Sequence, residues 1–563
     1  MPISSQICVS YTPTLYFVGF CSHIHHIHFR AQPCLVSDLF KIKLITLENE
    51  SIILEQHVPF AKSLFWQLNR DYYQNNGIDA WREDDVPSHL TTNSMVGMTY
   101  ANLIFAFLKD LAFHQKSEEI VYFLELGAGQ GRLAFHVLKH LTALTENYGQ
   151  PLPPFCYILS DIVEENLNFY LDHPQFKPYF EAGLLDVCYF DGVVTKALNL
   201  KFKELKIDAK CLKQPLVVIA NYFFDSIPND LFFIENGDVT PCSVTLTTEK
   251  MDEPITHLKD IDITYQRMEG KMPFYENEGF NDLIDTYTKE LSHTFLLFPH
   301  MALQCLLNLD GLSDQGLMLI SMDKGFHAMQ DLDKFPEPEL ITHGSASLWV
   351  NYHALSSFCH KLGGKALLPQ NSSFNLELVS LLMTKKHEQF PETQMAYHHF
   401  VNVFGPDDFN TLKKWSFKHI ETMTLKEWIA ILRLSAYDSV MFIALLPRLK
   451  QLYPEISIHE RRRISETFHK TWDMYFALNE NFDLAFAMAG IFYDLAYYED
   501  AITFFNHSMN LFGSRADALY NIALCHYQLR QDIQFECLLL EIKKEFPDFT
   551  KIGELTKLDL SAK

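Results

Sequence analysis

The chain has 563 residues, which is too long for one hydrophobic core and predicts two or three domains. Its composition is 48% hydrophobic and 21% charged, so it contains enough apolar material for packed cores and is not a disordered chain. The formal net charge of -24 opposes sequence-independent binding to nucleic acid, which depends on clustered Lys and Arg, and favours cationic partners.

The 11 cysteines are scattered without a CxxC pair, so the sequence indicates neither a disulfide framework nor a zinc site, and it favours a reducing compartment. We therefore expect a cytoplasmic protein without a bound metal. No apolar window of about eighteen residues stands out, so no membrane span is predicted. The strongest apolar run, Met441–Leu446, is a short piece of core.

Residues 1–50 stay unassigned. The apolar run Tyr11–Phe20 has no basic residue before it, so a secretory signal is not expected. The lack of acidic residues before Asp38 is typical of a mitochondrial transit peptide, whereas the single Arg30 is not, so that address stays open. This segment also contains a compact group of metal-ligating residue types: Cys21, His23, His25, His26 and His28. Because no second ligand cluster follows at zinc-site spacing, we predict no metal there.

The first α/β unit begins at Val121, in VYFLELGAGQGRLAFHVLKHL. The apolar run Val121–Leu124 predicts a strand, and apolar residues on one face predict a helix after it: Leu133, Val137, Leu138 and Leu141. Between strand and helix, Gly127, Gly129 and Gly131 allow a sharp turn and a close approach to a ligand. Together with the free N–H groups of the helix N-terminus, this turn predicts a polar cofactor.

The spacing of this turn is GxGxG, and Glu125 stands two residues before the first glycine. A dinucleotide site has GxGxxG instead, and a carboxylate at this position would repel a pyrophosphate. The same carboxylate is suited to the amino group of a methionine moiety, which indicates S-adenosylmethionine. The alternative is a purely structural turn from strand to helix.

Two further strands end in aspartates. The strand Tyr157–Leu159 runs into Asp161, where an α/β cofactor site places a carboxylate that accepts hydrogen bonds from the ribose hydroxyls. The strand Val187–Phe190 ends at Asp191, which we expect to accept from the adenine amino group. A surface Asp-Gly turn is the alternative for Asp191.

The fourth strand begins at Pro215, in PLVVIANYFFDSIPNDLF, and ends near Asn221 and Asp225. Ligands of open α/β sheets bind beyond the carboxyl ends of the strands, so both side chains are expected to face the methyl donor as catalytic residues. The alternative is an Asx turn that ends the strand.

This segment resembles the MidA-like methyltransferases, which include the mitochondrial complex I assembly methyltransferases and share an Asn-Glu-Phe-x-Asp-Ala-Leu-Pro stretch. The shared positions are Asn221, Phe223, Asp225, Ile227 and Pro228. Other segments resemble the family in the same order: Tyr72–Trp81, Val86–Tyr100, Glu125–Ala134, Leu319–Phe326, His343–Leu355 and the stretch from Phe404. The resemblance covers roughly residues 60 to 415.

The resemblance implies a Rossmann-like class I methyltransferase sheet and methyl transfer from S-adenosyl-L-methionine, in one branch to an arginine of a partner protein. The chain departs from the family at Tyr222, where the family has Glu, and at Lys324, where it has Tyr. Three upstream acids are candidates to replace the missing carboxylate: Glu83, Asp84 and Asp85. We expect a structural role for Asp323, because a fifth strand ends farther from the methyl group.

Beyond Phe404 helical periodicity replaces strands, and a repeat of tetratricopeptide type with a period of about 34 residues begins at Asp483. The matching pairs are Ala489 with Ala523, Leu495 with Leu529, Phe505 with Leu539 and Gly513 with Pro547. Tyr498 and Ala501 stand at expected places in the first copy, whereas the second has Phe535 where Ala is usual. Two copies are fewer than a stable array needs, so the preceding helices are expected to stack on them.

The sequence thus predicts residues 1–50 as an unassigned segment, 51–415 as a methyltransferase domain, 416–475 as a helical connector and 476–563 as tetratricopeptide-like helices. The expected function is methylation of a protein side chain, with arginine as one acceptor, on a partner recruited in part by the helical repeats. The alternatives are a methyltransferase-fold scaffold or assembly factor with weakened catalysis, and a methyltransferase acting on a small molecule. A homo-oligomer is a further possibility.

Overall fold

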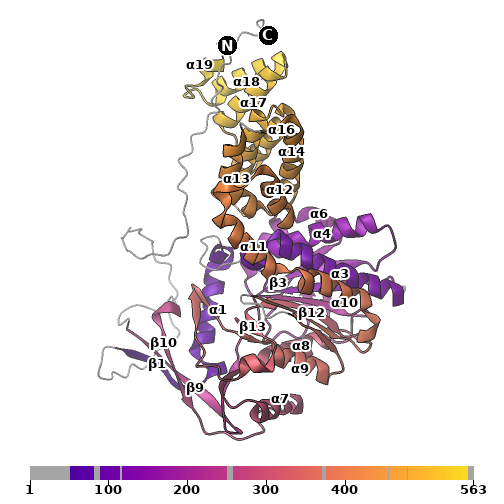
Figure 1. Ribbon diagram of the computed structural model, residues 1–563, viewed down its shortest axis with the longest axis vertical. Coiled ribbons are helices and arrows are strands. Elements are labelled where there is room, and N and C mark those ends of the chain that lie inside the picture. The colour runs from indigo at the N-terminus through magenta and orange to yellow at the C-terminus, as the bar shows by residue number, and fades with distance from the viewer. Residues whose placement is uncertain are drawn as a thin grey trace. The chain divides into compact units, whose positions relative to one another are not determined.

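The computed structural model describes residues 51–81, 89–114, 117–249, 258–370, 376–453, 456–478 and 480–555 (Figure 1). The histidine-rich N-terminal group, from Cys21 to His28, lies outside the described residues. Contacts divide the described chain into a larger unit, residues 51–456 with 469–478, and a smaller one, residues 457–468 with 480–555. This division follows compactness, and the domain boundaries derived from the sequence stay predictions.

The larger unit is built on a seven-stranded sheet with the order β17-β18-β12-β7-β2-β3-β4. Its strands are β2 (Val121–Leu126), β3 (Phe155–Asp161), β4 (Leu185–Tyr189), β7 (Leu216–Asn221), β12 (Leu317–Asp323), β17 (Lys365–Leu367) and β18 (Glu377–Met383). The chain moves outward from β2 through β3 and β4, then crosses to β7 on the other side of β2, all in parallel. The reversal between β2 and β7 opens a crevice at the carboxyl ends of these strands.

Alternate residues of the sheet enter different cores. Phe123 lies in the core shared with α3 (Ser94–His114), α4 (Arg132–Tyr148) and α10 (Pro391–Tyr397). Leu124 lies in the opposite core, with α7 (Glu278–Glu290), α8 (His300–Asp310) and α9 (Tyr352–Lys361). Figure 1 shows α3 and α10 on one face of the sheet and α8 and α9 on the other. The predicted α/β sheet with flanking helices is confirmed.

Helix α3 is long and apolar enough to cross a membrane by length and composition, which the sequence analysis did not anticipate. It is the one such helix among the described residues, and 67% of its apolar window is buried inside the protein. It packs on α4 and α10, so the core of the larger unit accounts for its apolar character.

A second, antiparallel sheet was not predicted. Its strands are β1 (Ile52–Pro59), β8 (Asp230–Glu235), β9 (Asp238–Thr248), β10 (Asp262–Arg267) and β11 (His293–Phe298). Phe65 and Trp66 of α1 (Leu64–Asn76) pack in the core beneath this sheet. Helix α1 begins after Ser63, whose side chain accepts a hydrogen bond from the Phe65 amide at 3.2 Å. The second sheet therefore fixes the position of α1.

Further helices and strands belong to the larger unit. The helices are the 3-10 turn η2 (Gly77–Trp81), α2 (His89–Thr92), α5 (Glu164–Asp172), α6 (Lys177–Glu181), α11 (Pro406–Lys418), α12 (Leu425–Leu434) and α13 (Ser439–Leu452). A π-helical stretch, His398–Val403, follows α10. The short strands are β5 (Leu198–Leu200), β6 (Leu205–Ile207), β13 (Gly325–Phe326), β14 (Ile341–His343), β15 (Ser345–Ser347) and β16 (Val350–Asn351).

The smaller unit is all-helical in its described residues. Besides the start of α14 (Ile458–Asp473), it contains α15 (Leu484–Asp494), α16 (Tyr498–Phe512), α17 (Ala516–Gln528), α18 (Asp532–Glu545) and α19 (Ile552–Leu555). Each helix from α15 to α18 packs on the next. Ala489 and Ala523, which occupy the same place in the predicted repeat, are both fully buried. The assignment to the tetratricopeptide class stays a prediction.

Candidate functional site

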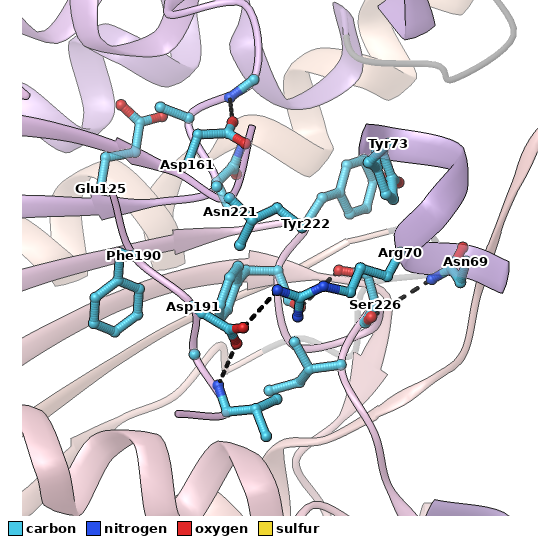
Figure 2. Close-up of a pocket in the computed structure, with 18 of the residues that line it drawn as sticks. Asn69, Arg70, Tyr73, Glu125, Asp161, Phe190, Asp191, Asn221, Tyr222 and Ser226 are labelled. Atoms are coloured by element: carbon cyan, nitrogen blue, oxygen red, sulfur yellow. Dashed lines mark hydrogen bonds and ion pairs between the residues drawn. The ribbon is translucent and has the colours of Figure 1, made fainter. Parts of the chain in front are cut away.

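A cavity of about 320 Å³ lies at the carboxyl ends of β2, β3 and β7, where the strand order reverses (Figure 2). The glycine-rich turn, the strand ends, residues 190–194 and the segment after β7 form one part of its lining, and α1, η2 and α2 form the rest. Its volume is at the lower end of the range of about 300–1,000 Å³ for ligand pockets. Six of the eight predicted site residues line it: Glu125, Gly127, Gly129, Asp161, Asp191 and Asn221.

Glu125 stands near the end of β2 with only 3% of its surface exposed. The Tyr157 hydroxyl donates a hydrogen bond to Glu125 Oε2 at 2.8 Å. Burial raises the pKa of Glu125 to about 8, and the nearby Asp161 adds to this, while the Tyr157 bond opposes it. A cationic group in the cavity would favour the ionised carboxylate, so Glu125 is suited to a ligand amino group.

The three glycines of the turn have positive φ angles, at 60°, 56° and 74° for Gly127, Gly129 and Gly131. A Cβ atom on Gly129 would come within 2.9 Å of the Trp81 ring. Gly131 does not line the cavity; it is the left-handed N-cap of α4, and a Cβ there would meet Phe176 at 3.1 Å. Gly131 therefore allows the left-handed turn into α4 without contributing to the cavity wall.

Asp161 is bound into the same turn. Its Oδ2 accepts from the Gly129 amide at 3.1 Å and from Asn166 Nδ2 at 3.2 Å, and its Oδ1 accepts from the Val163 amide at 3.0 Å. Carboxylate oxygens accept more than one hydrogen bond each, so these contacts orient the group without excluding ribose hydroxyls. Asp161 thus connects the end of β3 to the glycine-rich turn.

Asp191 has a partner that the sequence analysis missed. Arg70 Nη2 lies 2.6 Å from Asp191 Oδ2, and the Val193 amide donates to Asp191 Oδ1 at 2.9 Å. Figure 2 shows Arg70 extended from α1 toward Asp191. Both oxygens therefore already have protein partners. No sequence pattern signals Arg70, because the second sheet brings α1 to the cavity.

Asn221 lies at the cavity wall with both ends of its amide engaged. Its Nδ2 donates to the Thr91 carbonyl at 3.1 Å, and its Oδ1 accepts from the Tyr100 hydroxyl at 3.3 Å. These contacts join the end of β7 to α2 and α3. In the described geometry Asn221 acts as a connector between wall elements.

Asp225 lies outside the cavity lining, and its catalytic role stays a prediction. Its amide donates to Asp323 Oδ2 at 3.3 Å, and both carboxyl groups are buried. Burial raises the pKa of Asp225 to about 7, and burial with the Asp225 charge raises the pKa of Asp323 well above its usual value. Tyr222, at a positive φ of 49°, lines the cavity where the family has Glu.

Two cavity residues, Trp66 and Arg70, were not anticipated from sequence. The lining also includes Tyr73, Trp81 and Thr92, which belong to the two upstream segments that resemble the family. The three acids proposed as substitutes, Glu83, Asp84 and Asp85, lie outside the described residues. Among the residues that the structure describes, no group of three or more His, Cys, Asp or Glu side chains is arranged to hold a metal ion. The prediction of no metal site stays a prediction.

Residues 101–327 match a family described as "Putative S-adenosyl-L-methionine-dependent methyltransferase", and this description names the predicted cofactor. Two crystal structures of proteins of one superfamily from Burkholderia thailandensis also match, each over 55% of this chain. One, of an uncharacterized protein, has 14% identity, a TM-score of 0.35 and 73% coverage of its own chain. The other, bound to S-adenosyl-homocysteine, has 15% identity, a TM-score of 0.35 and 74% coverage. No curated protein matches the chain.

Proposed function

We propose that this protein is an S-adenosylmethionine-dependent methyltransferase. The observation that carries the proposal is the cavity at the strand reversal, lined by Glu125, the glycine-rich turn and Asp161. Such a crevice is where open α/β sheets bind their ligands. The family match over residues 101–327 covers these same residues.

The residues present fit this cofactor. Because Gly129 has no Cβ, the Trp81 ring can pack against the glycine-rich turn, where a Cβ would come within 2.9 Å of that ring. Glu125 would hold the amino group, Asp161 the ribose hydroxyls and the segment at Asp191 the adenine. When bound, the cofactor supplies an electrophilic methyl group. The aromatic side chains Trp66 and Tyr73 contribute apolar surface to the cavity wall.

For the acceptor we propose a protein side chain, on a partner recruited in part by the C-terminal helices. The net charge of -24 supports a cationic partner. Arginine is the first acceptor to test, although Tyr222 replaces the family Glu and Asp225 is turned to Asp323. An arginine acceptor would therefore need a carboxylate from another part of the chain or from the partner.

A small-molecule acceptor is the second candidate. The aromatic side chains of the lining, Trp66, Tyr73 and Tyr222, favour a compact, planar acceptor beside the cofactor. A scaffold without transfer activity is the third candidate function, and the departures from the family at Tyr222 and Lys324 favour it.

Calorimetric titration of the purified protein with S-adenosylmethionine and S-adenosylhomocysteine tests the proposal. We expect saturable binding of both with a stoichiometry near one. Labelled-methyl transfer to separated protein and small-molecule fractions of a lysate then distinguishes the acceptor classes. No binding by the folded protein would overturn the enzyme proposal and leave the scaffold, and binding without transfer to either fraction would favour weakened catalysis.

A further inference from the structure

The loop between α12 and α13 has an unusual backbone. Ala436 and Tyr437 both have positive φ angles, 53° and 60°. Neither residue is Gly or Asn, so each position carries strain of about 1–3 kcal/mol that surrounding contacts must offset. The Tyr437 amide donates to the Leu432 carbonyl at 2.7 Å, which closes the turn and sets Asp438 at the start of α13.

Asp438 has two different sets of partners. Its Oδ1 accepts from the Met441 amide at 2.9 Å, the usual N-cap contact of a helix. Its Oδ2 accepts from the Ser94 amide at 3.2 Å, at the N-terminus of α3. The Ser94 hydroxyl donates back to the Ala436 carbonyl at 2.8 Å, and His89 Nε2 of α2 lies 3.2 Å from Asp438 Oδ1. The loop is therefore hydrogen-bonded to the Ser94 end of the segment His89–Ser94, and Asp438 lies next to the His89 ring at its other end.

That segment is part of the cavity wall. Thr91 and Thr92 line the cavity, and the Thr91 carbonyl accepts the hydrogen bond from Asn221 at the end of β7. Helix α2 has only 4 residues, too few to be stable without tertiary contacts. Its position depends on groups that bind it from outside, and Asp438 is one of them. All of these residues belong to the larger unit.

We propose that Asp438 is a positioning residue for the cofactor cavity, acting through the segment His89–Ser94. The turn Ser435–Asp438 and the segment His89–Ser94 both lie outside the family-matched residues 101–327. Whatever shifts α12 or α13 would then change the affinity for the methyl donor. The inference rests on the proposed function, because the cavity is taken to be the cofactor site.

The alternative is that Asp438 serves only as the N-cap of α13. The two roles separate chemically, because Asn caps helices as well as Asp does but has a single side-chain oxygen. Asp438→Asn can keep the bond from the Met441 amide, but it then presents an NH₂ donor to the Ser94 amide. Asp438→Ala removes both contacts.

Asp110 offers a matched control. It is also buried, and it also accepts two backbone hydrogen bonds at a helix start, from the Glu392 amide at 3.1 Å and the Thr393 amide at 2.8 Å. It caps α10 and does not line the cavity. Asp110→Ala should therefore reduce stability as Asp438→Ala does, without reaching the cofactor site.

The test is calorimetric titration of the full chain and these variants with S-adenosylhomocysteine, at a temperature where urea unfolding shows each to be folded. We expect Asp438→Ala to weaken binding by about fivefold or more. Asp438→Asn should recover stability without recovering affinity, and Asp110→Ala should bind as wild type. Affinity that follows stability across all three variants would overturn the positioning role.

Hydrogen exchange in the segment His89–Ser94 is measured on the same samples. We expect faster exchange there in Asp438→Ala and Asp438→Asn, and no change in Asp110→Ala. If wild type itself does not bind S-adenosylhomocysteine, the proposed function fails, and the exchange rates alone decide on the attachment. Unchanged exchange in both Asp438 variants would overturn the proposal that Asp438 holds the segment His89–Ser94 in place.

Discussion

Arg70 and Asp191 form an ion pair, with Arg70 Nη2 2.6 Å from Asp191 Oδ2, that joins α1 to the segment after β4 at the cavity. The Arg70 side chain is 30% exposed and that of Asp191 is 6% exposed. Because the carboxylate is the more deeply buried partner, losing the cation costs more than the loss of a surface pair. The pair also connects two layers of the fold, since the second sheet carries α1.

Replacing Arg70 with Met should lower the free energy of unfolding by about 1–2 kcal/mol and weaken S-adenosylhomocysteine binding, because Asp191 loses the group that orients it. Urea unfolding and calorimetry measure the two effects. Lys213→Met is the control, because it removes the exposed pair with Asp314 at 3.0 Å, which solvent screening makes a much weaker contribution to stability. Equal stability losses and unchanged binding would contradict the prediction.

Gly129→Ala should weaken S-adenosylhomocysteine binding by about tenfold, because the added Cβ would stand 2.9 Å from the Trp81 ring and displace one cavity wall. Gly149→Ala is the matched control. Its φ of 66° is similarly left-handed, but nothing lies within 4 Å of the added atom. It should lose about 1 kcal/mol of stability and keep its affinity. A similar affinity loss in both variants would mean that backbone strain alone is responsible.

Stability should depend on pH through Glu125. Its pKa is about 8 in the folded protein against an ordinary value of 4.5, so the folded state retains a proton that the unfolded state releases between these values. The free energy of unfolding must therefore fall as pH rises through this window and level off above it. Asp225, with a pKa of about 7, acts in the same direction.

Glu125→Gln isolates the contribution of Glu125, because it removes the titrating group and keeps the side-chain size. We expect a shallower decline in urea-derived stability between about pH 5 and pH 8 than in wild type. Identical slopes in the two proteins would show that Glu125 is not protonated in the folded state.

Asp225→Asn separates a structural from a catalytic role. Because Asp225 is paired with Asp323 and does not line the cavity, the neutral amide should stand in for a protonated carboxyl group. We expect unchanged S-adenosylhomocysteine affinity and a stability change below about 1 kcal/mol at neutral pH. Once an acceptor is known, a loss of methyl transfer at full cofactor affinity would restore the catalytic role predicted from sequence.

Sequence patterns alone predict the local elements on either side of the glycine-rich turn. Val121–Leu124, the three glycines and the apolar face of α4 carry patterns set by backbone geometry over a few residues, and the structure contains the strand, turn and helix where they were expected. Asp161 and Asp191 could be placed near one cavity because parallel strands of one sheet end at the same edge.

The side chains from distant segments that meet at the cavity depend on tertiary packing, which local patterns do not report. Arg70 reaches Asp191 because an unpredicted antiparallel sheet holds α1, and Asp438 reaches Ser94 across 344 positions of the chain. The Asp225 amide donates to Asp323, and Tyr222 has a positive φ, and no periodicity of the sequence reveals either feature. These contacts depend on the packing of whole elements against one another. Sequence patterns report the face that an element buries, but not the partner that covers it.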